Sequence, residues 1–246
     1  MASYDDGASC ARFSVGSVIS RSFQVLFSHV ALFLGVTLAS LAAIVALSVL
    51  IGVFLGDRPI SAFVSYMSAT SIGMVTQGLV DYAVFQVLTG RPAYVGKSAS
   101  YALARVGQLV VISIASSIGI GLGMLLLVIP GLVLICVWAV VVPACVVEGL
   151  GVMDAFSRSA SLTKGHRLQV LGIFILSGVV VTAFIIAAGI LGGLIFGANT
   201  TLITILLCFI ILFPMAFFNV MGAVMYFRLR VASEGVTIES LSGVFD

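Results

Sequence analysis

Long runs of apolar residues, separated by short polar segments, make up most of this chain. No aspartate, glutamate, lysine or arginine occurs in segments 22–56, 59–80, 106–147 and 168–227. A helix that crosses the hydrocarbon core of a bilayer needs about 20 apolar residues, so each of the last two segments is long enough for two crossings. The pattern predicts six transmembrane helices, at Val30–Leu55, Ala62–Leu88, Val106–Ile129, Leu132–Val147, Leu168–Phe196 and Leu202–Phe227.

Turn-forming residues fall between the members of each predicted pair of spans. Residues 57–59 read Asp-Arg-Pro, residues 130–131 read Pro-Gly, and residues 197–200 read Gly-Ala-Asn-Thr. These segments are expected to close three helical hairpins. The fourth span is short and contains Pro143, so we expect a kink there. The apolar run after His29 is too long for a signal peptide, and Val30–Leu55 is expected to remain as the first span.

The positive residues fix the orientation of these spans. Ten of the eleven lysines and arginines fall on one side of a six-span arrangement, and Arg58 alone falls on the other. Cytoplasmic loops carry the excess of lysine and arginine in membrane proteins. The sequence therefore predicts a multi-pass protein with both termini in the cytoplasm.

Composition excludes several other classes of protein. Charged residues make up 8% of the chain and hydrophobic residues 61%, with a mean hydropathy of +1.30. A soluble domain carries about 25% charged residues. The net charge of +2 and the lack of a basic run with interleaved aromatics predict no nucleic-acid partner. The four cysteines show neither metal-ligand nor disulfide spacing, so we expect no metal and no cofactor.

An internal repeat organises the chain. Segment 15–35 recurs at 152–172, with valine, Ser-Arg-Ser, histidine and Leu-Gly at the same offsets, and a fainter copy begins at residue 95. We interpret each copy as an amphipathic interfacial helix followed by a two-span hairpin. The prediction is an all-α integral membrane protein with one membrane domain over residues 1–246. Its units lie at roughly 13–90, 91–150 and 151–231, with polar cytoplasmic tails at 1–12 and 232–246.

Several short motifs resemble a known family. They read IPGL, VP, EG, AFSRS, LTKGH and YFRLR, at residues 129–132, 142–143, 148–149, 155–159, 162–166 and 226–230. This pattern is similar to the membrane domain attached to some bacterial glycerophosphoryl diester phosphodiesterases, and to related stand-alone inner-membrane proteins of unknown function. The resemblance implies a six-span module of the bacterial cytoplasmic (inner) membrane. The phosphodiesterase reaction of that family belongs to a separate soluble barrel domain, which has no counterpart in these residues.

A polar stripe on the second predicted span is the first candidate site. Tyr66, Thr70, Gln77 and Asp81 recur at helical spacing on an otherwise apolar helix. A carboxylate within a span costs several kcal/mol unless it is paired, protonated or hydrated. The stripe either lines a hydrated path for a substrate, or Asp81 pairs with a cation such as Arg105 and holds the bundle together.

Two further sets of residues are candidates. A cytoplasmic cluster suited to a lipid headgroup phosphate would comprise Glu148, Arg158, Lys164, His166 and Arg167, although such charges also commonly mark the membrane interface. A stripe of small residues on the fifth span would allow close helix packing or self-association, at Gly189, Gly193 and Gly197.

No motif for catalysis is present: the chain has no nucleophile elbow, no Walker lysine in a glycine-rich loop and no HExxH. An enzyme is therefore not expected. The polar stripe and basic segments favour a transport or lipid-handling module with membrane lipids as partners. The alternative is a scaffold subunit that binds other membrane proteins or a second copy of itself. A hydrated cavity at Asp81 would favour transport, and a packed interior with an apolar groove would favour the scaffold.

Overall fold

A computed structural model describes residues 14–56, 58–89, 95–197 and 199–234, and every regular element in these ranges is an α-helix. The predicted tail 1–12, most of the tail 232–246, and Arg91 lie outside the described residues. The helices are α1 (Val15–Ser28), α2 (Val30–Leu55), α3 (Pro59–Leu88), α4 (Val95–Ala104), α5 (Val106–Leu126), α6 (Val128–Val137), α7 (Val141–Glu148), α8 (Val152–Leu162), α9 (Arg167–Phe196) and α10 (Thr200–Glu234).

Five segments among the described residues are long and apolar enough to cross a membrane. They are Val30–Leu55, Val106–Leu126, Val128–Glu148, Arg167–Phe196 and Ile210–Glu234. The chain is therefore an all-α membrane protein. Helix α3 has 30 residues but does not belong to this group, because its serine, threonine and glutamine residues make it too polar. The predicted count of six spans is thus not confirmed.

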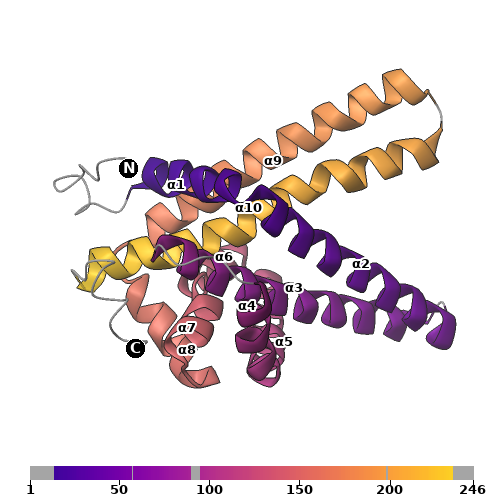
Figure 1. Cartoon of the computed structure of the whole chain (residues 1–246). Coiled ribbons are helices and arrows are strands. Elements are labelled where there is room, and N and C mark those ends of the chain that lie inside the picture. Colours follow the sequence, from indigo (N-terminus) through magenta and orange to yellow (C-terminus); the bar gives the residue numbers. More distant parts are fainter. Residues whose placement is uncertain (1–13, 57, 90–94, 198, 235–246) are drawn as a thin grey trace.

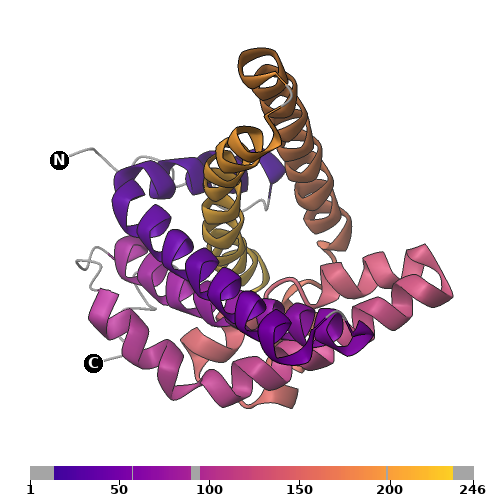
Figure 2. The same cartoon turned by 90° about the vertical axis from the view of Figure 1, so that its right-hand side faces the viewer.

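Three helical hairpins extend from one common packed end of the molecule. The α2–α3 and α9–α10 hairpins diverge toward their tips (Figure 1), and the α5–α6 hairpin points in a third direction (Figure 2). Near the tips, large apolar side chains are exposed, among them Val53 (75%), Phe54 (78%) and Leu194 (78%). An apolar surface of this extent is suited to lipid rather than to water.

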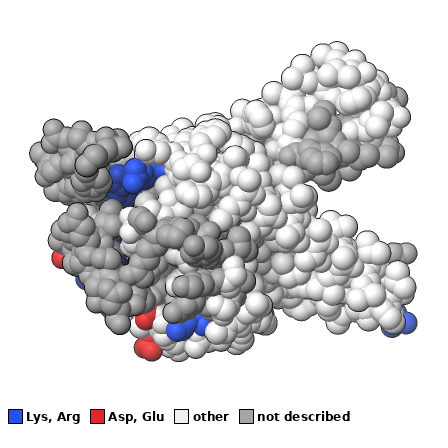
Figure 3. Space-filling model, in the orientation of Figure 1, with Lys and Arg blue, Asp and Glu red and all other residues white. Residues whose placement is uncertain are grey.

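Charged side chains gather at the opposite, packed end. Figure 3 shows them there, together with one basic group at the tip of the α2–α3 hairpin, where Arg58 precedes α3. The start of α1 and the end of α10 also lie at the packed end (Figure 1). The described charges therefore follow the asymmetry that the sequence predicts.

The turn between α5 and α6 differs from the prediction. The helix breaks at Leu127, whose backbone is extended (φ −159°, ψ 139°), while Pro130 and Gly131 lie in the first turn of α6. A proline is tolerated there because the first N–H groups of a helix have no partner within it. Gly131 serves packing instead, since a Cβ on it would lie 2.6–2.8 Å from atoms of Met124.

The fourth predicted span is interrupted, as expected, but not at Pro143. The break covers residues 138–140, between α6 and α7, and Pro143 lies in the first turn of α7. Proline removes a hydrogen bond from the preceding turn, so the chain leaves the helical path just before it.

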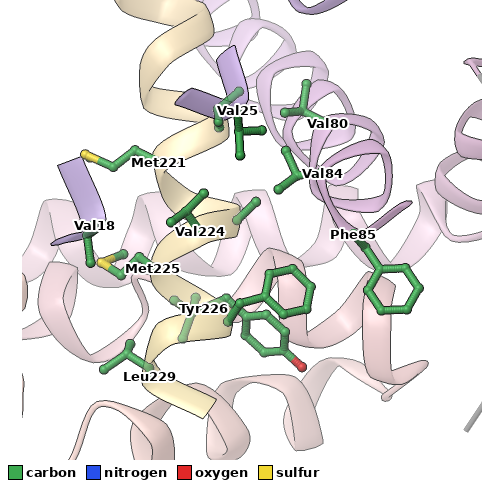
Figure 4. Close-up of a cluster of buried hydrophobic side chains, with 14 of the residues drawn as sticks. Val18, Val25, Val80, Val84, Phe85, Met221, Val224, Met225, Tyr226 and Leu229 are labelled. Carbon is green, nitrogen blue, oxygen red and sulfur yellow. The ribbon is translucent and has the colours of Figure 1, made fainter. Parts of the chain in front are cut away.

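The C-terminal half of α10 forms the centre of the core. In Figure 4, Val18 and Val25 of α1 pack on one side of this helix, and Val80 and Val84 of α3 lie on another. Tyr226 has no exposed surface, and its hydroxyl points away from the apolar cluster. The best-packed part of the protein is therefore the charged end, not the hairpin tips.

The repeated segments adopt equivalent structures. Helices α1 and α8 begin at equivalent positions of the repeat, and so do α2 and α9. Ser22 and Ser159, which are also equivalent, are both fully buried. In the sequence, Val152, Met153, Phe156 and Ala160 fall on one apolar face of α8. That prediction is wrong in part, because Met153 is 80% exposed and the buried side chains are Ala155, Ser159 and Leu162.

Candidate functional site

The polar stripe of α3 runs from an exposed surface into the packed end. Tyr66 is 56% exposed, whereas Asp81 is completely buried. The hydroxyl of Thr70 donates a hydrogen bond to the carbonyl of Met67 within its own helix (2.9 Å). The amide of Gln77 lies against Gly222 of α10, where an added Cβ would be 2.9 Å from its nitrogen. The stripe therefore does not line one continuous open path.

Asp81 lacks the partner that one interpretation required. Neither of its carboxylate oxygens has a hydrogen-bond partner among the described residues. Arg105, the proposed partner, instead donates a hydrogen bond to Gln108 (3.4 Å) and lies against Gly149. The prediction of an Asp81–Arg105 pair is wrong because α4 and α5 direct the guanidinium toward the end of α7. Burial of a carboxylate without a hydrogen-bond partner costs free energy, so Asp81 lowers the stability of the folded protein.

A network of five polar side chains joins α7, α8 and α10 at the packed end. Glu148 accepts hydrogen bonds from Arg158 Nε (2.8 and 3.0 Å) and from the Tyr226 hydroxyl (2.6 Å). Glu234 forms ion pairs with Arg158 and with Arg230 (3.0 Å). Burial alone would lower the pKa of Arg158, but hydrogen bonds from its guanidinium to Glu148 and Glu234 outweigh this effect and raise its pKa. The guanidinium therefore stays charged.

This network differs from the predicted headgroup cluster. The structure joins Glu148 to Arg158 but adds Tyr226, Arg230 and Glu234 from α10, and it leaves Lys164 and Arg167 exposed and unpaired with Glu148. His166 takes the N-cap position of α9. Two carboxylates balance two guanidiniums in the network, so no net positive charge remains there for a phosphate. Its role in the described structure is to hold three helices together.

The glycine stripe of α9 does not pack within the described chain. A Cβ added at Gly189, Gly193 or Gly197 would meet no atom within 4 Å. The expected internal packing is therefore absent at these positions, because α9 diverges from the bundle toward its tip. Self-association through the stripe stays a prediction.

An apolar groove lies between α1, α9 and α10. It has a volume of about 600 Å³ and is lined by two residues of α1, seven of α9 and three of α10. The ring of Phe23 of α1 packs at a tilt against that of Phe217 of α10, with centroids 4.5 Å apart, and the ring centroids of Phe27 and Phe213 are 5.9 Å apart. Pro214 also lines the groove. A ligand site of a small molecule typically measures about 300–1,000 Å³, so the groove has the size of a ligand site.

The lining of this groove is almost free of polar atoms. Ser177 is the one polar residue, and its hydroxyl donates to Met221 Sδ (3.3 Å), a contact that turns it toward α10. Leu176, Val180 and Phe184 are 47%, 58% and 53% exposed. The groove therefore opens onto the apolar outer surface of α9, and its chemistry suits a hydrocarbon chain.

The chain was compared with protein-family models, with curated proteins and with solved structures. None of them matches. The interpretation of the site therefore rests on its geometry and chemistry.

The sequence did not reveal the groove. Its wall on α9 includes Ala183 and Ala187, one turn apart, and its wall on α10 surrounds Pro214. A pair of alanines in one span and a proline in the next is a weak signal, because both occur often in transmembrane helices. The contribution of α1 required knowledge of how that helix packs.

Proposed function

We propose that this chain is a six-span protein of the bacterial inner membrane that handles membrane lipid and has no catalytic chemistry of its own. The observation that carries the proposal is the apolar groove between α1, α9 and α10, which opens toward the lipid-facing surface. The resemblance to membrane domains of the phosphodiesterase family agrees with this proposal.

The sixth span in this proposal is α3. Helices α2 and α3 form a hairpin whose tip contains Arg58, and the far end of α3 returns to the core, where Phe85 stacks on Phe227 of α10 (5.8 Å). If α2 crosses the bilayer, α3 has to cross back to reach that position. Its polar side chains are tolerated because they bond within the protein, as between the hydroxyls of Ser71 and Ser113 (2.8 Å).

The packed end faces the cytoplasm in this proposal. The support is the sequence count, in which ten of the eleven lysines and arginines fall on one side of the six-span arrangement. Both termini are then cytoplasmic, and the tips of the α2–α3 and α9–α10 hairpins reach the opposite leaflet.

Lipid is favoured over a polar substrate by two features. Asp81 is completely buried and does not line the groove, so the acidic group expected to serve transport is closed off in this conformation. The groove offers neither a charge nor a free hydrogen-bond donor to a polar solute, and it is bordered by side chains that face lipid. An acyl chain gains free energy there only through packing, since it leaves an equally apolar medium.

Lipid retention tests the proposal. The protein is extracted in a mild detergent from native membranes, and its bound lipids are counted by native mass spectrometry. The double variant Ala183→Trp/Ala187→Trp fills the groove and is expected to lose the most tightly held lipid. Ala46→Trp, on the exposed surface of α2, is the matched control and is expected to retain it. The proposal fails if the folded groove variant keeps the same lipids as the wild type.

A scaffold subunit is the second candidate. The uncovered glycines of α9 favour it, because a stripe of small residues with no neighbour in its own chain can receive the helix of another. Gly193→Leu is expected to abolish an assembly of this kind without altering lipid retention. Cross-linking in native membranes measures the assembly, and an unchanged cross-linked species in the variant excludes this role for the stripe.

A further inference from the structure

We infer that the groove holds one acyl chain of a phospholipid from the leaflet next to the packed end, with the chain's methyl end pointing toward the tip of the α9–α10 hairpin. This inference rests on the proposed lipid-handling function and adds the ligand's leaflet and direction.

The depth of the groove along α9 supports the choice of leaflet. The lining residues of α9 extend from Leu176 to Ala187. These two residues are separated by about 17 Å along the helix, and Ala187 lies about 14 Å before the helix ends at Phe196. The hydrocarbon core of a bilayer is about 30 Å thick, so one leaflet accounts for about 15 Å. The groove therefore has the length of one leaflet. It is centred on α9, but measured from the tip it covers the range from about 14 to about 30 Å. With the tip at the far surface of the hydrocarbon core, this range is the leaflet next to the packed end.

Helix α10 gives the same depth independently. Its lining residues Phe213 and Phe217 lie about 20 and 26 Å from the start of α10 at Thr200. Both therefore lie in the half of the bilayer away from the tip. The two helices of the hairpin agree on the position of the site.

The orientation of α1 defines the two ends of the groove. Val15 lies beside Gly172 of α9, at the packed end, whereas Phe27 contacts Phe213, closer to the tip. Helix α1 therefore runs alongside the groove from the packed end toward the tip and covers one side of it. A chain that enters from the adjoining leaflet meets Ile19 and Leu176 first and reaches Phe213 and Ala187 last.

The lining of the groove also predicts that the site does not select between phospholipid headgroups. No charged side chain lines the groove, and the nearby network of Glu148 and Arg158 is neutralised within the protein. Selection therefore acts on the chain rather than on the headgroup. Exchange of phosphatidylethanolamine for phosphatidylglycerol is expected to change occupancy by less than about threefold, an effect below 1 kcal/mol.

Depth-resolved photo-cross-linking tests the inference in liposomes of defined composition. One phospholipid carries a diazirine near the carboxyl end of its acyl chain, and another carries it near the methyl end. The first is expected to insert at the level of Ile19 and Leu176, and the second at the level of Ala187 and Phe213. Ala183→Trp should lower both insertions about tenfold, and Ala46→Trp should not change them.

The outcomes separate this inference from the proposed function. If insertion depends on the groove but the order of the two probes is reversed, the lipid comes from the other leaflet and the inference is wrong, while lipid handling stands. If both probes label the exposed faces of α2 and α9 alike in every variant, the groove holds no specific lipid and both proposals fail. Where Ala183→Trp does not give a monodisperse protein in detergent, Ala183→Leu provides the same comparison with a smaller side chain.

Discussion

Replacement of Glu148 by alanine removes the acceptor at the centre of the packed end. In the folded protein its carboxylate accepts hydrogen bonds from Arg158 and Tyr226, and the side chain is only 15% exposed. After the substitution Arg158 keeps its ion pair with Glu234, but the buried hydroxyl of Tyr226 loses its acceptor. The variant therefore leaves one satisfied guanidinium and one unsatisfied donor.

The expected loss follows from these contacts. A hydrogen bond to a charged group contributes about 1.5–3 kcal/mol, and a buried donor without an acceptor costs about 1–3 kcal/mol. Arg158 is 24% exposed, so solvent screening reduces its share. We expect Glu148→Ala to lower the free energy of unfolding by about 2–4 kcal/mol in total.

Thermal unfolding in detergent micelles measures this loss. For a chain of this size, 1 kcal/mol corresponds to a shift of about 2–4 °C, so the Tm is expected to fall by roughly 5–15 °C. Tyr226→Phe removes the hydroxyl alone and should cost less. The double variant should then show a coupling energy of at least about 0.5 kcal/mol, because the two groups interact directly.

Arg58→Ala, at the exposed tip of the α2–α3 hairpin, should leave the Tm unchanged. If Glu148→Ala unfolds within about 2 °C of the wild type, or if its effect adds fully to that of Tyr226→Phe, the network does not hold the packed end together.

Three other experiments test separate parts of the structure. Gly131→Ala should destabilise the protein by about 1–3 kcal/mol, because the added Cβ would lie 2.6–2.8 Å from atoms of Met124. Gly193→Ala, which has open space around it, should leave the stability unchanged. Thermal unfolding of the two variants measures the difference. Asp81→Leu removes a buried carboxylate without a partner and should raise the free energy of unfolding by about 1–3 kcal/mol; a lower Tm would instead show that Asp81 has a stabilising partner. Single cysteines at Arg58 and Lys164 should react with a membrane-impermeant reagent from opposite sides of intact vesicles, and reaction from one side would overturn the six-span arrangement.

The sequence predicted the elements more reliably than the contacts between them. The hairpins α2–α3 and α9–α10 were placed within three residues, except that α10 continues seven residues beyond the predicted end at Phe227, because apolar run length and turn residues are local properties of the chain. The turn near Pro130 was misplaced because proline is compatible with the first turn of a helix as well as with a loop. The starts of α1 and α8 were predictable from the repeat, whereas the buried face of α8 was not.

For the candidate sites, too, the sequence indicated individual residues but not the contacts between them. Asp81 was identified as unusual from its position in an apolar helix, but only the packing of α3 against α10 showed that it is enclosed and unpaired. Glu148 was grouped with Arg158, Lys164 and Arg167 because they are close in sequence. Arg158 does pair with it, but its other partner, Tyr226, is 78 residues away.

The sequence alone determined that the chain is helical and that it belongs in a membrane, and it predicts that the positive charge lies on one side. These properties depend on hydropathy and charge, which add up along a one-dimensional chain. The tertiary structure alone decided the partners of Glu148, the enclosure of Asp81 and the groove between α1, α9 and α10. Each of these features requires side chains from different helices to meet. How the helices pack depends on their relative rotation and depth. An apolar sequence with weak amphipathic patterning does not specify that rotation or depth.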